Sequence, residues 1–444
     1  MVHGSQTRIR ACALTLLLLA PAALRTSAGE RNEIDPHVVA GVSALVNELR
    51  VSIPLSAPAV QQASFGSRAA TQVSHTAAGY VRAGVGCMSD RSPATMAREF
   101  RYRIGPLIGW DNPHVIPLGS DRYLWLVHDS YMDYSFEATT LREVRPQIQN
   151  LAFIQSGSCF SLFHRGTLTR PTNFEPGRNA DPPNSFFWPL GGMRDGARVK
   201  VFWARMAVST TQPGPWEGIV RHPTGTWVGE YDARTLERLA FYRSPSNDAR
   251  EPQGASRFKV QYGFAVESTR TYSYLFGNAN MLNLAMSGGL DNSPHPATRM
   301  YLARVPRGRF DLAPEYRTAT GWSRDSEQAV PISSRYSNEN TMQPRRFGAD
   351  KWIAVTKVNG FNGDGVVIDV ATRPWGPWRT VQRLDFRTPY DSQITYHPVL
   401  MPWRTANGDL TMAIALNGGA SWEVALDNPH LYRPGVAEVA WPAS

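Results

Sequence analysis

Two aspartates flank a predicted β-hairpin, and their numbers place them opposite each other. His114-Val115-Ile116-Pro117-Leu118 predicts a strand, Gly119-Ser120-Asp121 a turn, and Tyr123 to Val127 the returning strand. If the hairpin turns about position 120, residues whose numbers sum to 240 are paired, as those of Asp111 and Asp129 do. Directly paired residues have Cβ atoms about 4.5–5.5 Å apart, close to the roughly 5–5.5 Å between the carboxyl groups of retaining glycosidases. The pair therefore indicates acid/base chemistry on a glycosidic bond.

Two carboxyl groups this close cannot both ionise freely, so one should keep a proton while the other stays charged. We assign Asp111 as nucleophile, because Trp110 and Asn112 beside it could hold it ionised, and Asp129 as general acid/base. A structural role is the alternative, since an aspartate at the start of a strand often accepts main-chain N–H bonds and Asp129 could pair with Arg205. A register slip of one residue would also send one aspartate to the opposite face.

The same hairpin pattern recurs five times, as an apolar strand, a polar turn and an aromatic-rich returning strand. The later copies turn at Arg194-Asp195-Gly196, Ser268-Thr269-Arg270, Gly348-Ala349-Asp350 and Ala406-Asn407-Gly408-Asp409. Repeats spaced by roughly 60–80 residues predict blades with long loops. We therefore predict an all-β fold, a five-bladed β-propeller with a short helical N-terminal extension, whose radial closure leaves only short sheet edges. A β-sandwich is the alternative.

In a propeller, the residues before each innermost strand converge at one mouth of the central channel. Here these positions hold mainly amides, aromatics and histidines, which favours a site for a hydroxyl-rich ligand. The predicted substrate-binding residues are Trp110, Asn112, His114, Asn184, Tyr262, Glu339, Asn340 and His397. The candidate stacking platforms for sugar faces are Trp110, Tyr131, Trp188, Tyr262 and Tyr396, each of which could equally belong to the core.

Other chemistries find little support in the sequence. Glu339 could be a third carboxylate, or a solvated loop residue. His114 and His397 lie near prolines on inner strands, where packing or hydrogen bonding suits them better than metal binding, so we expect no metal and no cofactor. The sequence has no Gly-x-Ser-x-Gly elbow, P-loop or His-Glu-x-x-His motif, which excludes the serine hydrolase, nucleotide-binding and zincin classes.

The N-terminal region predicts export. Arg8 and Arg10 precede an apolar run from Ala11 to Leu24 that is too short to span a bilayer, and small residues follow it. We interpret residues 1–28 as a cleaved signal peptide, with a retained anchor as the alternative, and expect a secreted, extracellular or periplasmic protein. Residues 29–84 should form a helix from Pro36 to about Arg50 and then a linker or strap, and residues 85–444 the propeller.

Cysteine usage and charge narrow the possible partners. Cys87 and Cys159 are the two cysteines that remain after signal removal, and an even pair in an exported protein predicts one disulfide. The net charge of +9 is scattered among aromatics and glycines, without the basic stripe that nucleic-acid binding needs. We expect a monomer with a polysaccharide substrate, no nucleic acid, and no stable membrane insertion after signal cleavage.

Two segments carry a resemblance to a known group. At Gly109-Trp110-Asp111-Asn112-Pro113-His114 and Trp125-Leu126-Val127-His128-Asp129-Ser130 the chain resembles secreted five-bladed propeller glycoside hydrolases related to bacterial endo-D-arabinanases, formerly a domain-of-unknown-function family. In architecture the resemblance spans about Val85 to Trp441, and Gly376-Pro377-Trp378 is a weaker match. It implies catalysis by Asp111 and Asp129 on arabinan-type furanosides such as mycobacterial arabinogalactan and lipoarabinomannan. The insertion from Phe136 to Asn150 departs from the family pattern and leaves the substrate open.

The sequence thus predicts a glycoside hydrolase that cleaves an arabinan-type polysaccharide with two aspartates. The alternative is a non-catalytic, glycan-binding or cell-wall-associated propeller. Amides outnumber acids at the predicted channel mouth, and amides and aromatics suffice for binding, whereas cleavage needs two carboxyl groups at a fixed separation.

Overall fold

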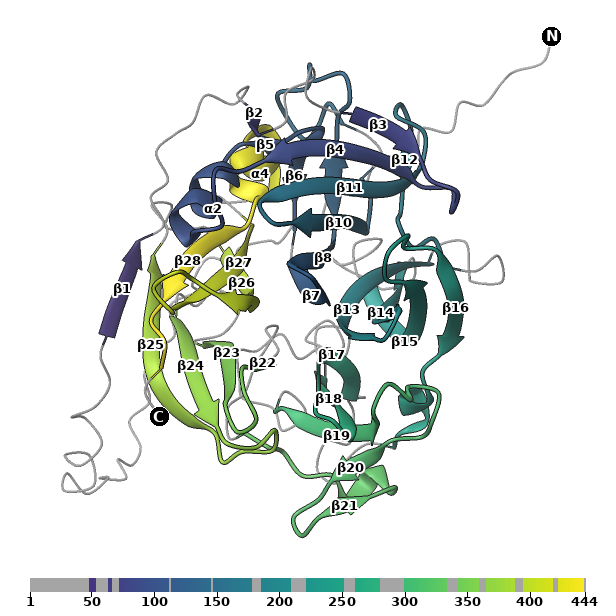
Figure 1. Cartoon of the computed structure of the whole chain (residues 1–444), viewed down its shortest axis with the longest axis vertical. Coiled ribbons are helices and arrows are strands. Elements are labelled where there is room, and N and C mark those ends of the chain that lie inside the picture. The colour runs from purple at the N-terminus through teal and green to yellow at the C-terminus, as the bar shows by residue number, and fades with distance from the viewer. Residues whose placement is uncertain are drawn as a thin grey trace, which may run out of the picture.

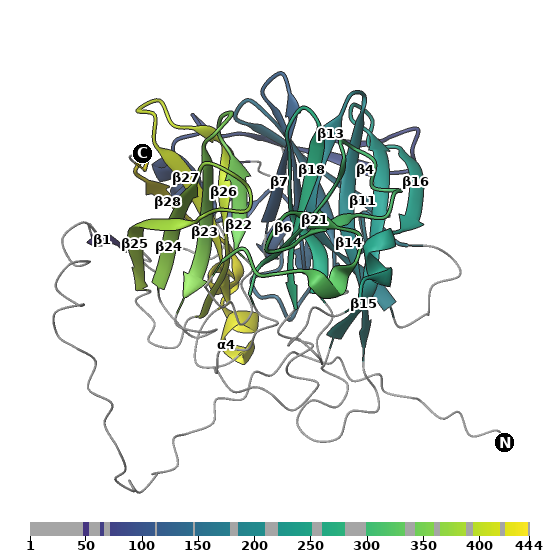
Figure 2. The ribbon, with the colours of Figure 1, turned by 90° about the horizontal axis from the view of Figure 1, so that it is seen from below.

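The computed structural model describes residues 48–52, 63–65, 72–111, 113–144, 147–177, 185–208, 221–250, 260–279, 299–333, 342–358, 365–387, 394–417 and 422–442. Five sheets surround a central channel as the blades of a five-bladed β-propeller, which confirms the predicted fold class (Figure 1). Seen from the side, the strands of the blades stand roughly along the ring axis (Figure 2).

Blade one holds the largest sheet, and chain segments far apart in sequence build it. From the channel outward its strands are β7 (Pro113–Gly119), β8 (Arg122–Val127), β10 (Leu151–Ser156), β11 (Cys159–Gly166), β4 (Val81–Cys87) and β3 (Gln72–His75), with β12 (Pro171–Thr172) paired to β11. The outer strands β3 and β4 therefore precede the inner hairpin in the chain.

The remaining blades follow in chain order around the ring. Blade two comprises β13 (Ser185–Asp195), β14 (Arg198–Val208), β15 (Arg221–Asp232) and β16 (Arg238–Arg243). Blade three comprises β17 (Val260–Ser268), β18 (Tyr272–Ala279), β19 (Tyr301–Pro306), β20 (Glu315–Arg317) and β21 (Trp322–Ser323). Blade four comprises β22 (Gln343–Arg346), β23 (Trp352–Val358), β24 (Gly365–Ala371), β25 (Arg379–Arg387) and β1 (Glu48–Ser52). Blade five comprises β26 (Ile394–Arg404), β27 (Leu410–Asn417) and β28 (Gly435–Val439).

A small accessory sheet and short helices complete the described part of the chain. The sheet contains β2 (Ala63–Phe65), β5 (Arg103–Ile104), β6 (Leu107–Trp110) and β9 (Ser130–Met132). The helices are α2 (Pro93–Glu99) and α4 (Trp422–Asp427), with 3-10 turns η1 (Pro245–Asp248), η3 (Ser326–Gln328) and η4 (Pro429–Tyr432). Ser92 caps α2 by accepting the Thr95 N–H at 3.2 Å. Within these described ranges no helix is long and apolar enough to span a membrane.

The five predicted hairpins are the innermost strand pairs of the blades. Their first strands, β7, β13, β17, β22 and β26, contact one another around the ring and line the channel. In the first hairpin Gly119, Ser120 and Asp121 all have positive φ, at 82°, 52° and 56°. Gly and Asp are among the residues that tolerate this left-handed region best, so the turn forms where its residue types predict it.

The disulfide is present between Cys87 on β4 and Cys159 on β11, which face each other in the strand register with Cα atoms 3.8 Å apart. It ties the N-terminal segment to the hairpin of β10 and β11. The domain boundary expected at residue 85 falls inside β4, because β4 already belongs to the sheet of blade one and buries Val81, Ala83 and Val85 completely.

The predicted helix from Pro36 to about Arg50 is wrong at its C-terminal end. Glu48–Ser52 form β1, which pairs in parallel with Arg383 to Arg387 of β25. Bonding to the free edge of β25 satisfies main-chain groups of both segments, and this tertiary pairing outweighs the local helical pattern. The rest of that helix, and the predicted signal peptide 1–28, lie outside the described residues.

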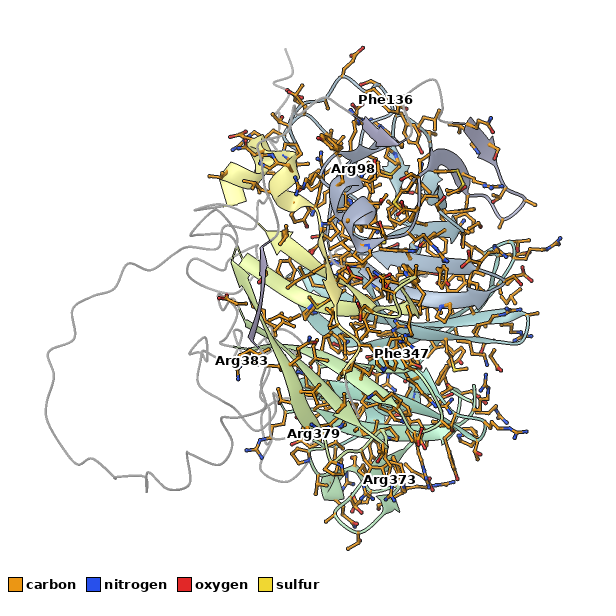
Figure 3. All side chains as sticks on the ribbon, turned by 60° about the vertical axis from the view of Figure 1, so that its left-hand side comes forward. Arg98, Phe136, Phe347, Arg373, Arg379 and Arg383 are labelled. Atoms are coloured by element: carbon orange, nitrogen blue, oxygen red, sulfur yellow. A yellow bond between two sulfur atoms is a disulfide. The ribbon has the colours of Figure 1, made fainter. Side chains whose placement is uncertain are left out.

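Several arginines are exposed on the outer surface of the described blades. Arg379 and Arg383 are exposed on β25 at the outer part of blade four (Figure 3). Other arginines lie over aromatic rings, as Arg304 does at 4.1 Å from the ring centre of Tyr272 and 4.2 Å from that of Trp322. Stacking of this kind holds the guanidinium on the protein surface.

Candidate active site

Asp111 and Asp129 are paired across adjacent strands. β7 and β8 pair Pro113 with Val127, β6 and β9 pair Trp110 with Ser130, and the Asp111 N–H donates to the Asp129 carbonyl oxygen at 3.0 Å. These partners have the number sum expected from a turn at position 120, so the predicted register is confirmed. Directly paired residues project to the same face of a sheet.

Side chains from the two neighbouring blades converge on these carboxyl groups. The Tyr396 hydroxyl, from β26 of blade five, donates to Asp111 Oδ1 at 2.6 Å, and the Trp188 indole N–H, from β13 of blade two, donates to Asp129 Oδ1 at 3.0 Å. Asp111 is half-buried, whereas Asp129 is only 6% exposed. Trp188 and Tyr396, predicted as stacking platforms, therefore also hold the two carboxyl groups in place.

Tyr432 is a site residue that sequence reasoning missed. It lies on η4 near the C-terminus, is 2% exposed, and packs edge-on against the Tyr131 ring at 6.0 Å. Burial raises the pKa of Tyr432 well above its usual value, and the charges of Asp111 and Asp129 raise it further. Its phenol is therefore a permanently protonated group near both aspartates. No strand or turn pattern marks this position, so only the three-dimensional structure reveals it.

Three histidines form a layer beneath the aspartates. The His128 ring stacks against His114 at 5.6 Å and Trp188 at 5.2 Å, and lies 6.4 Å from the His397 ring. The Nε2 of His128 donates to the Pro189 carbonyl oxygen at 2.8 Å, the only role open to it because a carbonyl can only accept. Burial lowers the pKa of His128 to about 4 and that of His397 to about 3. The layer is therefore uncharged at neutral pH.

Two predicted substrate-binding residues instead belong to the core. Trp110 is 1% exposed and packs against Phe100 and Phe153, at 5.2 and 5.6 Å between ring centres. Tyr262 is also 1% exposed and packs against Tyr316 at 5.3 Å. Rings enclosed in this way cannot stack on a sugar. The predicted stacking and substrate-binding role of both residues is therefore wrong, and the alternative, that they belong to the core, holds.

The other predicted site residues divide into two groups. His114 and His397 take part in the histidine layer described above. Asn112, Asn184, Glu339 and Asn340 lie outside the described residues. Over the described ranges no group of three or more histidine, cysteine or carboxylate side chains is placed to hold a metal ion.

Comparison with known protein families identifies the family of this chain. Residues 98–442 match the family described as a domain of unknown function (DUF5005). The chain belongs to this family. The DUF5005 region begins within α2 and includes both aspartates and the inner hairpin of every blade, whereas β3 and β4, the outer strands of blade one, precede it. A search of curated protein sequences finds no match.

Solved structures share the fold at low sequence identity. A "putative hydrolase" from Bacteroides ovatus superposes with a TM-score of 0.53 at 13% identity, over 83% of this chain and 93% of that one. A β-xylosidase gives a TM-score of 0.41 at 10% identity, over 75% and 93% of the two chains. An exo-beta-1,3-galactanase from Phanerochaete chrysosporium gives 0.36 at 8%, over 74% and 62%. Likenesses at this level do not carry an activity from one protein to another.

Proposed function

We propose that the protein is a glycoside hydrolase that uses Asp111 and Asp129 to cleave an arabinan-type furanoside polysaccharide. The observation that carries the proposal is the cross-strand pairing of the two aspartates, with a hydrogen-bond donor from a neighbouring blade on each. Glycoside cleavage needs two carboxyl groups at a fixed separation, one that gives a proton to the leaving oxygen and one that acts at the anomeric carbon. The resemblance of the two aspartate segments to endo-D-arabinanase-related propellers supports the arabinan substrate.

In this proposal Asp111 is the nucleophile. Its carboxylate is half-buried and so can reach a substrate at the channel mouth, and the Tyr396 hydroxyl stabilises its negative charge. Asp129 is the general acid/base: it protonates the leaving glycosidic oxygen as Asp111 attacks the anomeric carbon. In the second step Asp129 takes a proton from water, and that water displaces Asp111 from the glycosyl-enzyme.

The neighbouring aromatic groups would support this chemistry. The histidine layer beneath the site is neutral, and the phenol of Tyr432 stays protonated near both carboxyl groups. Trp188, which is partly buried, presents an aromatic surface beside Asp129 for a sugar ring.

Aspartate replacement tests the proposal. Asp111→Asn and Asp129→Asn keep the side-chain shape, so both variants should fold, and cleavage of arabinan should fall at least about a hundredfold. Asp350→Asn, at an exposed turn of blade four, makes the same chemical change and should keep parental activity. In a retaining enzyme azide should restore turnover to Asp129→Asn and give a glycosyl azide of retained configuration, because this variant still makes the covalent intermediate. Parental rates in both aspartate variants would refute the assignment.

The amides and aromatics that the sequence places before the inner strands favour a second candidate, a non-catalytic glycan-binding propeller. The same incubation separates the two: release of oligosaccharides from arabinogalactan, arabinan or xylan identifies the hydrolase and its substrate. Retention of arabinan on the immobilised parental protein without any release would identify the binding protein instead.

We also propose that the protein is exported. The disulfide between Cys87 and Cys159 supports this, since such bonds persist in oxidising compartments and are rare in the cytosol. A mature N-terminus near Gly29 on protein recovered outside the cytoplasm is the expected result, and recovered protein that still begins at Met1 would contradict signal cleavage.

A further inference from the structure

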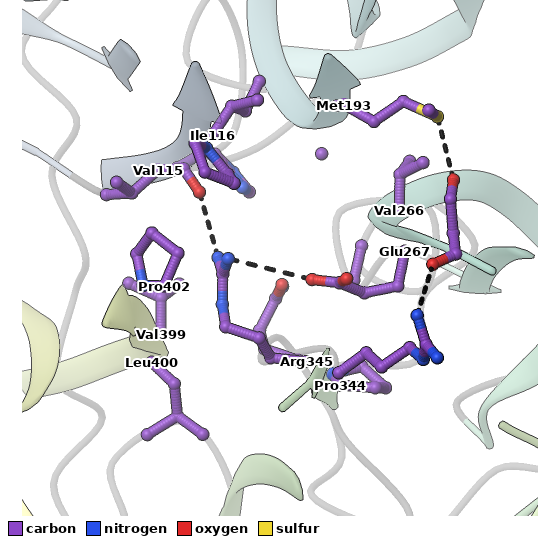
Figure 4. Close-up of a pocket in the computed structure, with 18 of the residues that line it drawn as sticks. Val115, Ile116, Met193, Val266, Glu267, Pro344, Arg345, Val399, Leu400 and Pro402 are labelled. Atoms are coloured by element: carbon purple, nitrogen blue, oxygen red, sulfur yellow. Dashed lines mark hydrogen bonds and ion pairs between the residues drawn. The ribbon is translucent and has the colours of Figure 1, made fainter. Parts of the chain in front are cut away.

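A cavity lies in the channel, at the end opposite the aspartates. It has a volume of about 240 Å³, and all five inner strands line it (Figure 4). The aspartates lie before β7 and after β8, whereas the cavity wall includes Arg194, Ser268 and Phe347, which lie at or beside the hairpin turns. His114 lines the cavity from the histidine layer, which therefore stands between it and the aspartates.

Positive charge dominates the cavity wall. Four of the lining residues are arginines and one is a carboxylate; the arginines are Arg194, Arg307, Arg345 and Arg346. The carboxylate, Glu267, forms an ion pair with Arg345 at 3.7 Å. Burial raises the pKa of Glu267 to about 7. A single carboxyl group therefore leaves most of the guanidinium charge uncompensated.

The same wall carries polar atoms without a partner. Gln343 Nε2, Arg346 Nε and His114 Nε2 are buried and make no hydrogen bond. Gln343 is only 7% exposed and His114 4%. The amide nitrogen and the guanidinium nitrogen can only donate, so an oxygen acceptor would satisfy both. A buried donor left without an acceptor costs about 1–3 kcal/mol, which makes these positions a prepared site for acceptor atoms.

The arginines are held in place with donors to spare. Arg345 donates one N–H to the Val115 carbonyl oxygen at 2.9 Å, and Arg346 donates one to the Ser268 carbonyl oxygen at 3.3 Å. A guanidinium has five N–H donors in a fixed fork. Arg194 and Arg307 are exposed, so this end of the channel is open to solvent. A ligand could enter there without passing the aspartates.

We propose that the turn end of the channel is a separate binding site for an oxyanion, either a free inorganic anion or the acidic group of a small sugar acid. Guanidinium forks and amide donors match carboxylate, phosphate and sulfate oxygens. The cavity is smaller than the about 300–1,000 Å³ typical of drug-sized ligands, so it suits one ion or one small acid. This site does not depend on the proposed hydrolase activity.

Calorimetric titration of the full-length protein with sodium phosphate, sodium sulfate and sodium D-glucuronate, at constant ionic strength, tests the proposal. Saturable binding of at least one of them is expected, and the one that binds most tightly identifies the source of the oxyanion. Arg346→Gln should weaken that binding at least tenfold, because it removes a charged donor. Gln343→Glu places a like charge against the ligand at almost unchanged volume and should abolish binding.

Three further variants keep the test decisive. Arg270→Gln, at the exposed β17–β18 turn, removes the same charge at the same end of the molecule without lining the cavity, and should bind as the parent does. If Arg346→Gln and Gln343→Glu do not fold, Arg307→Gln, whose side chain is exposed, should still weaken binding. Asp111→Asn should bind the anion normally, which separates this site from the proposed catalytic one. The proposal would be overturned if no probe showed saturable binding. It would also be overturned if the Arg346→Gln, Gln343→Glu and Arg307→Gln variants all bound the anion as tightly as the parent protein does.

Discussion

The hydroxyl of Tyr396 offers a sharp test of how the site is organised, because one oxygen atom can be removed without changing the shape of the side chain. Tyr396→Phe deletes the donor to Asp111 Oδ1 at 2.6 Å. Tyr396 is 8% exposed, so water has limited access to replace the hydroxyl. A hydrogen bond to a charged group contributes about 1.5–3 kcal/mol, and each 1.4 kcal/mol is about tenfold in rate. If Asp111 is the nucleophile, kcat/KM for arabinan should fall by about 10- to 100-fold.

Tyr123→Phe is the matched control. It also removes a phenol that donates to an aspartate, since the Tyr123 hydroxyl contacts Asp121 Oδ1 at 3.2 Å, but it does so at the turn end of the same hairpin. Kinetics with arabinan oligosaccharides should show the loss in Tyr396→Phe and parental values in Tyr123→Phe, with similar unfolding midpoints. A Tyr396→Phe enzyme within twofold of the parent would refute the view that this hydroxyl organises Asp111. Equal losses in both variants would point to a general effect on folding.

Two further predictions concern stability. The disulfide closes a loop with a sequence separation of 72, so replacing Cys87 and Cys159 together by alanine should lower the free energy of unfolding by up to about 4 kcal/mol in urea titrations; an unchanged midpoint would contradict this. Burial lowers the pKa of His128 from 6.5 to about 4, so the unfolded chain binds the extra proton between these values and stability should fall as the pH drops from 6.5 to 4. His128→Gln keeps a donor for the Pro189 carbonyl but cannot titrate, so the parent should lose about 3 kcal/mol more than the variant over this window; parallel stability curves would contradict this.

The inner hairpins could be predicted from the sequence because their signals are local. In blade one the turn residues Gly119, Ser120 and Asp121 set the reversal, and the alternation of the flanking strands sets which residues face each other. A hairpin of fixed turn and length leaves no freedom in register. That is why numbering alone places Asp111 opposite Asp129.

The contacts between distant segments could not be predicted in this way. β1 pairs in parallel with β25, and β4 joins β11 from a position far earlier in the chain than the inner hairpin. Nothing in the local pattern of Glu48–Ser52 specifies an edge more than three hundred residues away, as the register with Arg383 to Arg387 shows. For the same reason the sequence does not predict Tyr432 as a site residue, because its nearness to the aspartates depends on closure of the propeller ring.

The burial of aromatics explains the remaining errors at the site. Trp110, Trp188, Tyr262 and Tyr396 all lie at or before the inner strands, and sequence alone treats them alike. The structure separates them by the face on which each side chain projects: Trp110 and Tyr262 enter hydrophobic clusters, whereas Trp188 and Tyr396 reach the carboxyl groups. Successive side chains of a strand point to opposite faces of the sheet. The position of an aromatic residue along the strand therefore decides whether its ring packs in the core or can meet a ligand.

The channel is divided electrostatically as well as sterically. Two aspartates face one mouth, four arginines face the other end, and the histidines between them have pKa values too low for a proton at neutral pH. Because the layer is uncharged, it neither neutralises the carboxylates nor adds to the positive charge of the arginines. The arginines attract an anionic ligand to the turn end, whereas an uncharged sugar chain gains no such attraction there. Under the two proposals, one ring of five hairpins presents two sites that take different kinds of ligand.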